Sequence, residues 1–127
     1  IIHHPAYSGG FVSPGVSGVA DYLQLGLLPR IFGADMPIFV SYGGRFTFTE
    51  KQCKRISSYI KRPMGLMKAA CPAPGGGVTD ARLNELVELY GNDTMFLVGG
   101  DMFRRGPDIE ANMSYFVERL TKLSERT

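Results

Sequence analysis

The sequence predicts an α/β protein with a parallel sheet, and three observations support this class. Four short apolar segments typical of strands alternate with four segments of helical periodicity. The strand segments lack polar alternation, as expected when helices cover both faces of a parallel sheet. The longer glycine-rich loops follow the strands rather than the helices. Four strand–helix units fit an open doubly wound sheet or half of a barrel, and periodicity alone leaves both open.

The first predicted unit pairs a strand at residues 1–4 with a helix at residues 19–32. Two β-branched residues open the strand, and Ser17 can cap the helix. Gly33 ends the helical pattern, because glycine readily adopts the left-handed backbone found beyond a helix C-terminus. Pro29 lies inside the pattern, so we expect it to kink the helix or to divide it in two.

The second unit begins with a predicted strand at residues 37–42. Thr49 and Gln52 then have the form of a capping box, with the threonine as the cap and the glutamine reaching back to it. The helix that this box opens is expected to end near Lys61, because Pro63 follows.

The third unit begins with a predicted strand at residues 65–71, followed by a loop of prolines and glycines. Thr79 is expected to cap the next helix, and Gly91 is expected to end it. The apolar positions of this helix recur at the spacing of one buried face. They are Leu83, Leu86, Val87 and Tyr90.

The fourth unit begins with a short, continuously apolar strand predicted at residues 94–98. A last helix is expected to start near Pro107, since proline is favoured in the first turn. One stripe of this helix is expected to be buried. The stripe comprises Ile109, Met113, Phe116, Val117, Leu120 and Leu123.

The composition argues against nucleic acid and membranes as partners. The 127 residues are 44% hydrophobic and 20% charged, which is ordinary for a globular protein. The net charge of +2 is small, and no apolar run approaches the roughly 20 residues of a membrane span. Cys53 and Cys71 are too few for a disulfide scaffold and poorly spaced for zinc. We therefore expect buried thiols and a reducing, cytoplasmic setting.

The ends of the sequence indicate a fragment. The chain begins inside a strand signal with Ile1, without a methionine or the basic and apolar regions of a signal peptide. Its last amphipathic helix simply stops. We therefore expect residues 1–127 to be part of a longer protein.

Residues suited to ligand binding gather after the predicted strands. They are His3, His4, Gly43, Gly44, Arg45, Gly75, Gly76, Gly77, Gly99, Gly100, Arg104 and Arg105. The loops at the opposite edge, such as residues 33–35 and 91–93, look like plain connectors. In barrels and in open α/β sheets alike, ligands bind at the carboxyl ends of the strands. The ligand side is therefore the same under either architecture.

The two glycine clusters, at residues 75–77 and 99–100, predict an anion site. Without a Cβ atom their backbone N–H groups can approach an anion closely, and the helix after Thr79 adds a favourable partial charge behind the first cluster. Paired glycine turns after the last two strands fit the phosphate site common in barrels. The alternative is that these glycines only permit tight turns. Neither cluster has the Rossmann or P-loop fingerprint.

Arg45 and His4 are the candidate catalytic residues. Arg45 follows two glycines on an expected mobile loop, where its guanidinium could clamp a phosphate or carboxylate or simply be solvated. His4 ends the first strand and could act as a general base or an oxyanion partner, or be structural. His3 should point to the opposite side of the strand.

Several other residues have two interpretations each. Arg104 and Arg105 could help to hold an anion or be ordinary surface charges. Asp101 could contact substrate hydroxyls or cap the local turn. Three aromatic side chains either line the pocket or pack in the core: Tyr7, Tyr42 and Phe46.

Four stretches share their order and spacing with a known family. They are His4-Pro5-Ala6, Tyr42-Gly43-Gly44-Arg45-Phe46, Pro72-Ala73-Pro74-Gly75-Gly76-Gly77 and Leu89-Tyr90-Gly91-Asn92-Asp93. They resemble the RuBisCO large-subunit superfamily, and most closely its RuBisCO-like (type IV) branch. The resemblance covers almost the whole chain. It implies the C-terminal half of a (β/α)8 TIM barrel, with strands five to eight and their helices, and without the N-terminal domain and first half of the barrel.

By this resemblance, His4 is the active-site histidine at the end of strand five, and the two glycine clusters are the turns that bind a substrate phosphate. Arg45 stands on loop six, where carboxylases carry their catalytic lysine. Pro5 stands where carboxylases have an arginine that grips a second phosphate, and Ser8 stands where they have a second histidine. An arginine on loop six also differs from lysine in reach and proton affinity. We therefore do not expect carboxylation of a bisphosphate.

The resemblance implies an enzyme that acts on a phosphorylated sugar-derived keto acid or ketose phosphate. The reaction would pass through a metal-stabilised enediolate, as in an isomerase, enolase or decarboxylase/hydrolase. It also implies Mg²⁺ in the full-length enzyme, with its ligands outside this chain, and a homodimer. The chain alone is expected to be inactive. Two alternatives stay open, a true ribulose-bisphosphate carboxylase and a non-catalytic anion-binding half-barrel.

Overall fold

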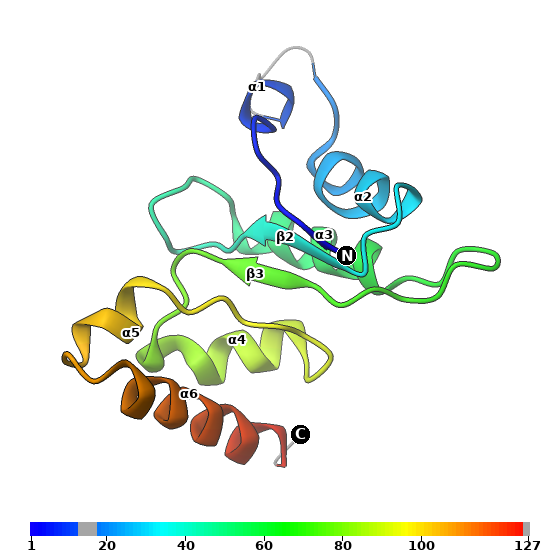
Figure 1. The fold of residues 1–127 in the computed structure, drawn as a ribbon. Coiled ribbons are helices and arrows are strands. Elements are labelled where there is room, and N and C mark those ends of the chain that lie inside the picture. Colours follow the sequence, from blue (N-terminus) through cyan, green and yellow to red (C-terminus); the bar gives the residue numbers. More distant parts are fainter. Residues whose placement is uncertain (13–17, 126–127) are drawn as a thin grey trace.

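A parallel three-stranded sheet in the order β1-β2-β3 lies at the centre of the computed structural model, which describes residues 1–12 and 18–125 (Figure 1). The elements in chain order are β1 (Ile2–His3), α1 (Gly9–Val12), η1 (Leu23–Leu27), α2 (Leu28–Ile31), β2 (Met36–Val40), α3 (Glu50–Lys61), β3 (Ala73–Gly75), η2 (Asp80–Arg82), α4 (Leu83–Tyr90), α5 (Gly100–Arg104) and α6 (Ile109–Ser124). In the sheet, Ile2 pairs with Met36, and Ile38 pairs with Ala73. The parallel sheet and its helices confirm the predicted α/β class, while closure into a barrel stays a prediction.

The third strand lies later than predicted, at Ala73–Gly75 instead of residues 65–71. Met64 and Met67 instead close a turn, in which each backbone N–H donates to the other residue's carbonyl. Gly65 in this turn has a φ of +56°, a left-handed conformation that does not continue a strand. The strand was predicted too early because the apolar residues of this segment suggested a strand, whereas Pro72 and Pro74 suggested a loop.

The predicted strand at residues 94–98 runs beside β3 but is reduced to a single bridge between Leu97 and Gly75. The N–H groups of Met95 and Leu97 donate to the carbonyls of Pro72 and Pro74, at 2.9 and 3.1 Å. Proline has no N–H to return these bonds. The ladder is therefore one-sided, which is why the segment does not form a regular strand.

The first long helix is divided, as Pro29 predicts. The π-helical segment η1 precedes α2, and the N–H of Leu28 donates to the carbonyl of Leu23. The wider π turn accommodates a proline that cannot donate to the carbonyl four residues before it. Gly33, with a φ of +91°, follows the end of the helix as predicted. The predicted cap Ser17 lies outside the described residues.

Helix α3 begins at the predicted capping box. The backbone N–H of Gln52 donates to the Thr49 hydroxyl, and the Gln52 side chain accepts from the N–H of Thr49. Its buried residues Cys53, Ile56 and Ile60 face the sheet. Cys53 and Cys71 are both free thiols; Cys53 is fully buried as expected, whereas the prediction was wrong for Cys71, which is only partly buried.

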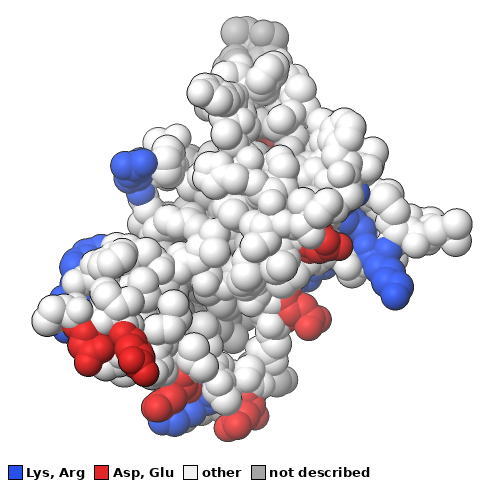
Figure 2. Space-filling model, viewed as in Figure 1, with Lys and Arg blue, Asp and Glu red and all other residues white. Residues whose placement is uncertain are grey.

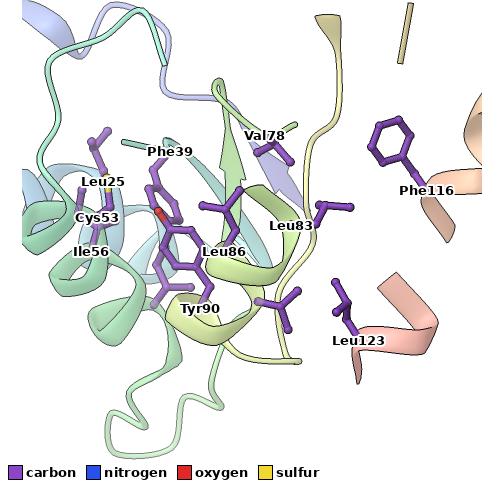
Figure 3. Close-up of a cluster of buried hydrophobic side chains, with 12 residues drawn as sticks. Leu25, Phe39, Cys53, Ile56, Val78, Leu83, Leu86, Tyr90, Phe116 and Leu123 are labelled. Carbon is purple, nitrogen blue, oxygen red and sulfur yellow. The ribbon is translucent and has the colours of Figure 1, made fainter. Parts of the chain in front are cut away.

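The core lies between the sheet and helices α3 and α4 (Figure 3). Phe39 of β2 and Tyr90 of α4 meet edge to face, with ring centroids 5.8 Å apart. Leu83 and Leu86 are completely buried beside them, as the helical spacing predicts. Each large apolar side chain buried in this way contributes about 1.5–3 kcal/mol to folding. This core fixes the strands whose ends carry the candidate site.

Helix α6 buries a narrower stripe than predicted. Phe116 and Leu123 are buried, and Leu120 packs against the core. The prediction was wrong for three other members of the stripe, which are about half exposed: Ile109, Met113 and Val117. The polar Asn112 is buried instead, because its side-chain amide donates to the carbonyls of Met102 and Gly106. Over the described ranges, every helix is too short or too polar to cross a membrane.

Candidate active site

A cavity of about 900 Å³ lies at the carboxyl ends of the strands. All seven residues predicted for the site line it: His4, Arg45, Gly75, Gly76, Gly77, Gly99 and Gly100. The strand order explains this convergence, since the segments after β1, β2 and β3 leave the sheet at the same edge (Figure 1). The bridge between Gly75 and Leu97 brings the fourth segment to that edge as well.

The two glycine clusters lie on neighbouring segments, and their glycines differ in what the fold requires of them. Gly77 has a φ of +73°, and a Cβ atom there would lie 2.7 Å from the backbone nitrogen of Gly44. Gly77 is therefore required by its backbone conformation and by close packing. Gly76 has a φ of +77°, but a Cβ atom there would meet no atom within 4 Å.

Gly99 is not required by its neighbours, since a Cβ atom there would meet nothing within 4 Å. Its φ of −113° and ψ of −89° lie outside the usual α and β regions. Gly100 begins α5, and a Cβ atom there would meet only the tip of the Arg104 side chain, at 3.5 Å. Close packing therefore requires a glycine at position 77 and not at position 99.

Arg45 and His4 are exposed in the cavity. The Arg45 guanidinium lies 4.9 Å from the centroid of the Phe46 ring, and within the described residues no carboxylate pairs with it. His4 follows β1 directly, and its carbonyl accepts from the N–H of Ala6. His3 is absent from the cavity lining, as the alternation of a strand predicts.

The structure gives Asp101, Arg104 and Arg105 different contacts, which the sequence alone could not distinguish. A carboxylate oxygen of Asp101 accepts from the backbone N–H of Asp80 at 2.8 Å, so it caps the start of a neighbouring helix, and Asp101 also lines the cavity. Arg104 lines the cavity, is largely exposed and lies 4.0 Å from the Asp101 carboxylate. Arg105 pairs with Asp80 at 3.8 Å and stacks on the Tyr115 ring. It is therefore a structural residue.

Thr79 does not cap its helix as predicted. It occupies the cap position before η2, but its side chain makes no capping hydrogen bond. The Asp101 carboxylate supplies that hydrogen bond from α5 instead. The sequence could not reveal this, because the cap lies 21 residues from the N–H that it satisfies.

Sequence reasoning also missed a polar cluster beside the cavity formed by Tyr42, Arg82 and Glu85. The Tyr42 hydroxyl donates to the Glu85 carboxylate, which also accepts from the Arg82 guanidinium at 2.9 Å. Burial, and then the hydrogen bond to Glu85, raise the pKa of Tyr42 to about 12. The only signal for this cluster in the sequence is the i,i+3 spacing of an arginine and a glutamate on a helix.

The walls of the cavity are mainly uncharged. Tyr7 and Phe46 line it and are exposed, so they do not pack in the core. Figure 2 shows the face over β2 and β3 almost free of charged side chains, which gather toward its rim. In such surroundings an anion is attracted to the few cations present, since apolar walls screen charges less than water does.

Known proteins are similar to this chain in sequence and in fold, although no family model matches it. Ribulose bisphosphate carboxylase-like protein 1 of Rhodopseudomonas palustris is 34% identical over 116 residues, which cover 91% of this chain and 30% of the relative. The 5-methylthioribulose-1-phosphate isomerase of Rhodospirillum rubrum is 31% identical, over 88% of this chain and 30% of the relative. A 2,3-diketo-5-methylthiopentyl-1-phosphate enolase of Exiguobacterium sibiricum is 32% identical, over 79% of this chain and 25% of the relative.

Solved structures agree with these relatives. A RuBisCO-like protein from Rhodopseudomonas palustris superposes with a TM-score of 0.78 at 33% identity, over 94% of this chain and 30% of that protein. A RuBisCO-like protein from Alicyclobacillus acidocaldarius superposes with a TM-score of 0.87 at 26% identity, over 99% of this chain and 32% of that protein.

The fold, the glycine turns and these relatives define the class: the chain is a homologue of the RuBisCO large-subunit superfamily. Its homologues are RuBisCO-like proteins, the type IV branch, and it matches a C-terminal part of them. The chain spans about 30% of the length of the first relatives. The family resemblance predicted from the four motifs is thereby confirmed.

Proposed function

We propose that this chain carries the phosphate-binding part of a RuBisCO-like active site. The substrate would be a phosphorylated sugar-derived keto acid or ketose phosphate. Its phosphate would lie against the backbone amides of the two glycine turns, with Arg45 and Arg104 as the nearby cations.

One observation carries this proposal: Gly99 lines the cavity, and a Cβ atom there would meet no protein atom within 4 Å. A side chain there would project into open space, so the absence of one leaves room for a ligand. Gly76 is open in the same way. The backbone N–H group of a residue without a side chain can approach an anion closely.

Arg45 and His4 have complementary roles in this proposal. Since no carboxylate among the described residues neutralises Arg45, its guanidinium is available to bind an anionic group of the substrate. His4 lines the same cavity and can accept a proton from, or donate one to, a carbon or oxygen of the substrate. The pair would bind the substrate and move its proton within one cavity.

The names of the relatives support isomerase or enolase chemistry. One relative is a 5-methylthioribulose-1-phosphate isomerase and another is a 2,3-diketo-5-methylthiopentyl-1-phosphate enolase. Both reactions move a proton next to a carbonyl group of a phosphorylated substrate. We propose this class of reaction, or a related decarboxylation or hydrolysis, for the full-length enzyme.

Pro5 and Ser8 support this class over carboxylation of a bisphosphate. Both line the cavity, at the positions where the family resemblance expects an arginine and a second histidine in carboxylases. Pro5 offers no charge to a second phosphate, and Ser8 offers a hydroxyl in place of an imidazole. A substrate with a single phosphate is therefore the better match.

The residues described here do not fit a Mg²⁺ site. Among them, no group of three or more His, Cys, Asp or Glu side chains is arranged to hold a metal ion. We propose that the Mg²⁺ implied by the family resemblance is held elsewhere in the full-length enzyme, and that this chain alone is inactive.

The remaining architecture is proposed from the same family resemblance. Residues 1–127 would form four strand–helix units of a (β/α)8 barrel, completed by other parts of the full-length protein. That protein would act in the cytoplasm as a homodimer, without nucleic acid or membrane partners.

The proposal is tested by giving Gly99 a side chain in the full-length protein. Gly99→Val places methyl groups in the cavity, and its Cβ atom meets no protein atom within 4 Å. We expect the affinity for inorganic phosphate, measured by calorimetry, to fall by roughly tenfold or more because a charged hydrogen bond is blocked. Gly10→Val is the matched control, since Gly10 is equally open but lies outside the cavity lining. Equal phosphate affinity in the two variants would refute the proposed site.

A further inference from the structure

The loop after β2 and the turn after β3 are in direct backbone contact. A Cβ atom on Gly44 would lie 3.0 Å from the backbone nitrogen of Gly77, and one on Gly77 would lie 2.7 Å from that of Gly44. No side chain fits between the two segments. Because both line the cavity, the position of one affects the position of the other.

Arg82 joins these two segments through a single nitrogen. Its Nη1 atom donates to the carbonyl of Tyr42 at 2.8 Å and to the carbonyl of Gly77 at 3.0 Å. The guanidinium also lies against Gly43, where a Cβ atom would come within 2.5 Å of Nη1. One side chain thus holds the start of the loop that carries Arg45 and the end of the glycine turn.

Glu85 and the Tyr42 ring fix the orientation of the Arg82 guanidinium. The Glu85 carboxylate accepts from Nη2 of Arg82 at 2.9 Å and from Nε at 3.4 Å. The guanidinium carbon lies 4.5 Å from the centroid of the Tyr42 ring. The side chain is only 21% exposed and is absent from the cavity lining, so it does not contact a ligand there.

We propose that Arg82 is a positioning residue that latches the Arg45 loop to the glycine turn. The latch would keep the Arg45 guanidinium and the amides of Gly76 and Gly77 at a fixed separation, ready for one anion. Its effect on anion binding rests on the proposed function, whereas the latch itself rests only on the contacts of Arg82.

The test compares Arg82→Lys with Arg55→Lys in the full-length protein. Lysine keeps the charge, but its one nitrogen cannot serve both carbonyls and both Glu85 oxygens. Arg55 is a matched control, because it also stacks on a tyrosine, at 4.6 Å from Tyr22, and pairs with a carboxylate, that of Asp21 at 2.7 Å. It joins no residues of the cavity lining.

Two readouts separate a latch from a general loss of stability. We expect hydrogen exchange in Arg82→Lys to rise in residues 42–48 and in residues 75–77 together, with no rise in α6. We expect affinity for inorganic phosphate to fall about tenfold, and neither change in Arg55→Lys. Exchange that is unaltered, or that rises in only one of the two segments, would overturn the latch.

A second variant decides the case if Arg82→Lys does not fold. Glu85→Gln leaves Arg82 in place but removes the charge that orients it, so a smaller joint rise in exchange is expected, and no rise would overturn the latch. A wild-type protein that binds no phosphate would instead refute the proposed function. In that case the exchange comparison alone decides whether the latch exists.

Discussion

The carboxylate of Asp101 accepts a hydrogen bond from the backbone N–H of Asp80 at 2.8 Å, which ties α5 to the start of the helix after the glycine turn. Asp80 lies after β3, and Asp101 lies after the segment that bridges β3 at Leu97, so the contact links the two glycine turns. Helix caps of this kind contribute about 0.5–2 kcal/mol. Asp101 therefore stabilises the arrangement of the two glycine turns that line the cavity.

The first prediction concerns this cap. Asp101→Ala is expected to lower the free energy of unfolding by about 1 kcal/mol, measured by denaturant unfolding, and to weaken phosphate binding. Asp108→Ala is the control, because Asp108 caps α6 by accepting from the N–H of Ala111, away from the cavity. It should lower stability similarly and leave phosphate affinity intact. Equal phosphate affinity in both variants would show that Asp101 does not shape the site.

A second prediction concerns the exposed cation of the cavity. Arg45→Ala in the full-length enzyme is expected to reduce kcat/KM by about tenfold or more, because a charged contact to the substrate is lost. Arg62→Ala is the control, since Arg62 is also exposed and lies over an aromatic ring, that of Tyr59, outside the cavity lining. An unchanged kcat/KM for Arg45→Ala would remove Arg45 from the mechanism.

Gly76 and Gly77 provide a third, paired prediction. Both have positive φ, so alanine strains either position by about 1–2 kcal/mol. Only Gly77→Ala also forces a Cβ atom to 2.7 Å from Gly44. We therefore expect Gly77→Ala to be the less stable variant in thermal unfolding, by at least a further 1 kcal/mol or so. Equal stability of the two variants would mean that the contact between the loop and the turn is not maintained in solution.

The fourth prediction concerns pH and Asp80. Hydrogen bonding from the Tyr115 hydroxyl, assisted by Arg119 and Arg105, lowers the pKa of Asp80 in the folded protein. The unfolded state therefore binds the proton more readily. The stability that this carboxylate contributes is present above the unfolded pKa, near pH 4, and is lost as pH falls through the lower folded value.

Asp80→Asn should accordingly be less stable than wild type at neutral pH, and the difference should shrink as pH falls below about 4. Denaturant unfolding at several pH values measures it. Asp93→Asn, at an exposed position, is the control. A difference between Asp80→Asn and wild type that stays constant from neutral to acid pH would contradict the role given to the ionised carboxylate.

The sequence predicted those parts of the fold that local chemistry determines. The Thr49–Gln52 box, the division of a helix at Pro29 and the buried face of α4 all depend on residues within a few positions of one another. The strand at Ala73–Gly75 was misplaced because Pro72 and Pro74 suggest a loop. Their carbonyls, which a sequence pattern does not reveal, accept hydrogen bonds from the next segment.

The candidate site was predictable to the extent that parallel strands end at one edge. That rule brings His4, Arg45 and the glycine turns to one cavity. It could not identify Arg82, whose partners are the carbonyls of Tyr42 and Gly77, one of them 40 residues away. Nor could it show that Arg105 faces Tyr115 while Arg104 faces the cavity, because neighbouring arginines on a helix look alike in sequence.

The central claim is that the open amides of Gly76 and Gly99 bind one phosphate, and crystals of the full-length protein soaked in inorganic phosphate would test it most directly. The account predicts a single anion between the two turns, within hydrogen-bond distance of both backbone nitrogens and near the Arg45 guanidinium. A cavity with no anion at either turn, or an anion bound only elsewhere on the surface, would contradict it.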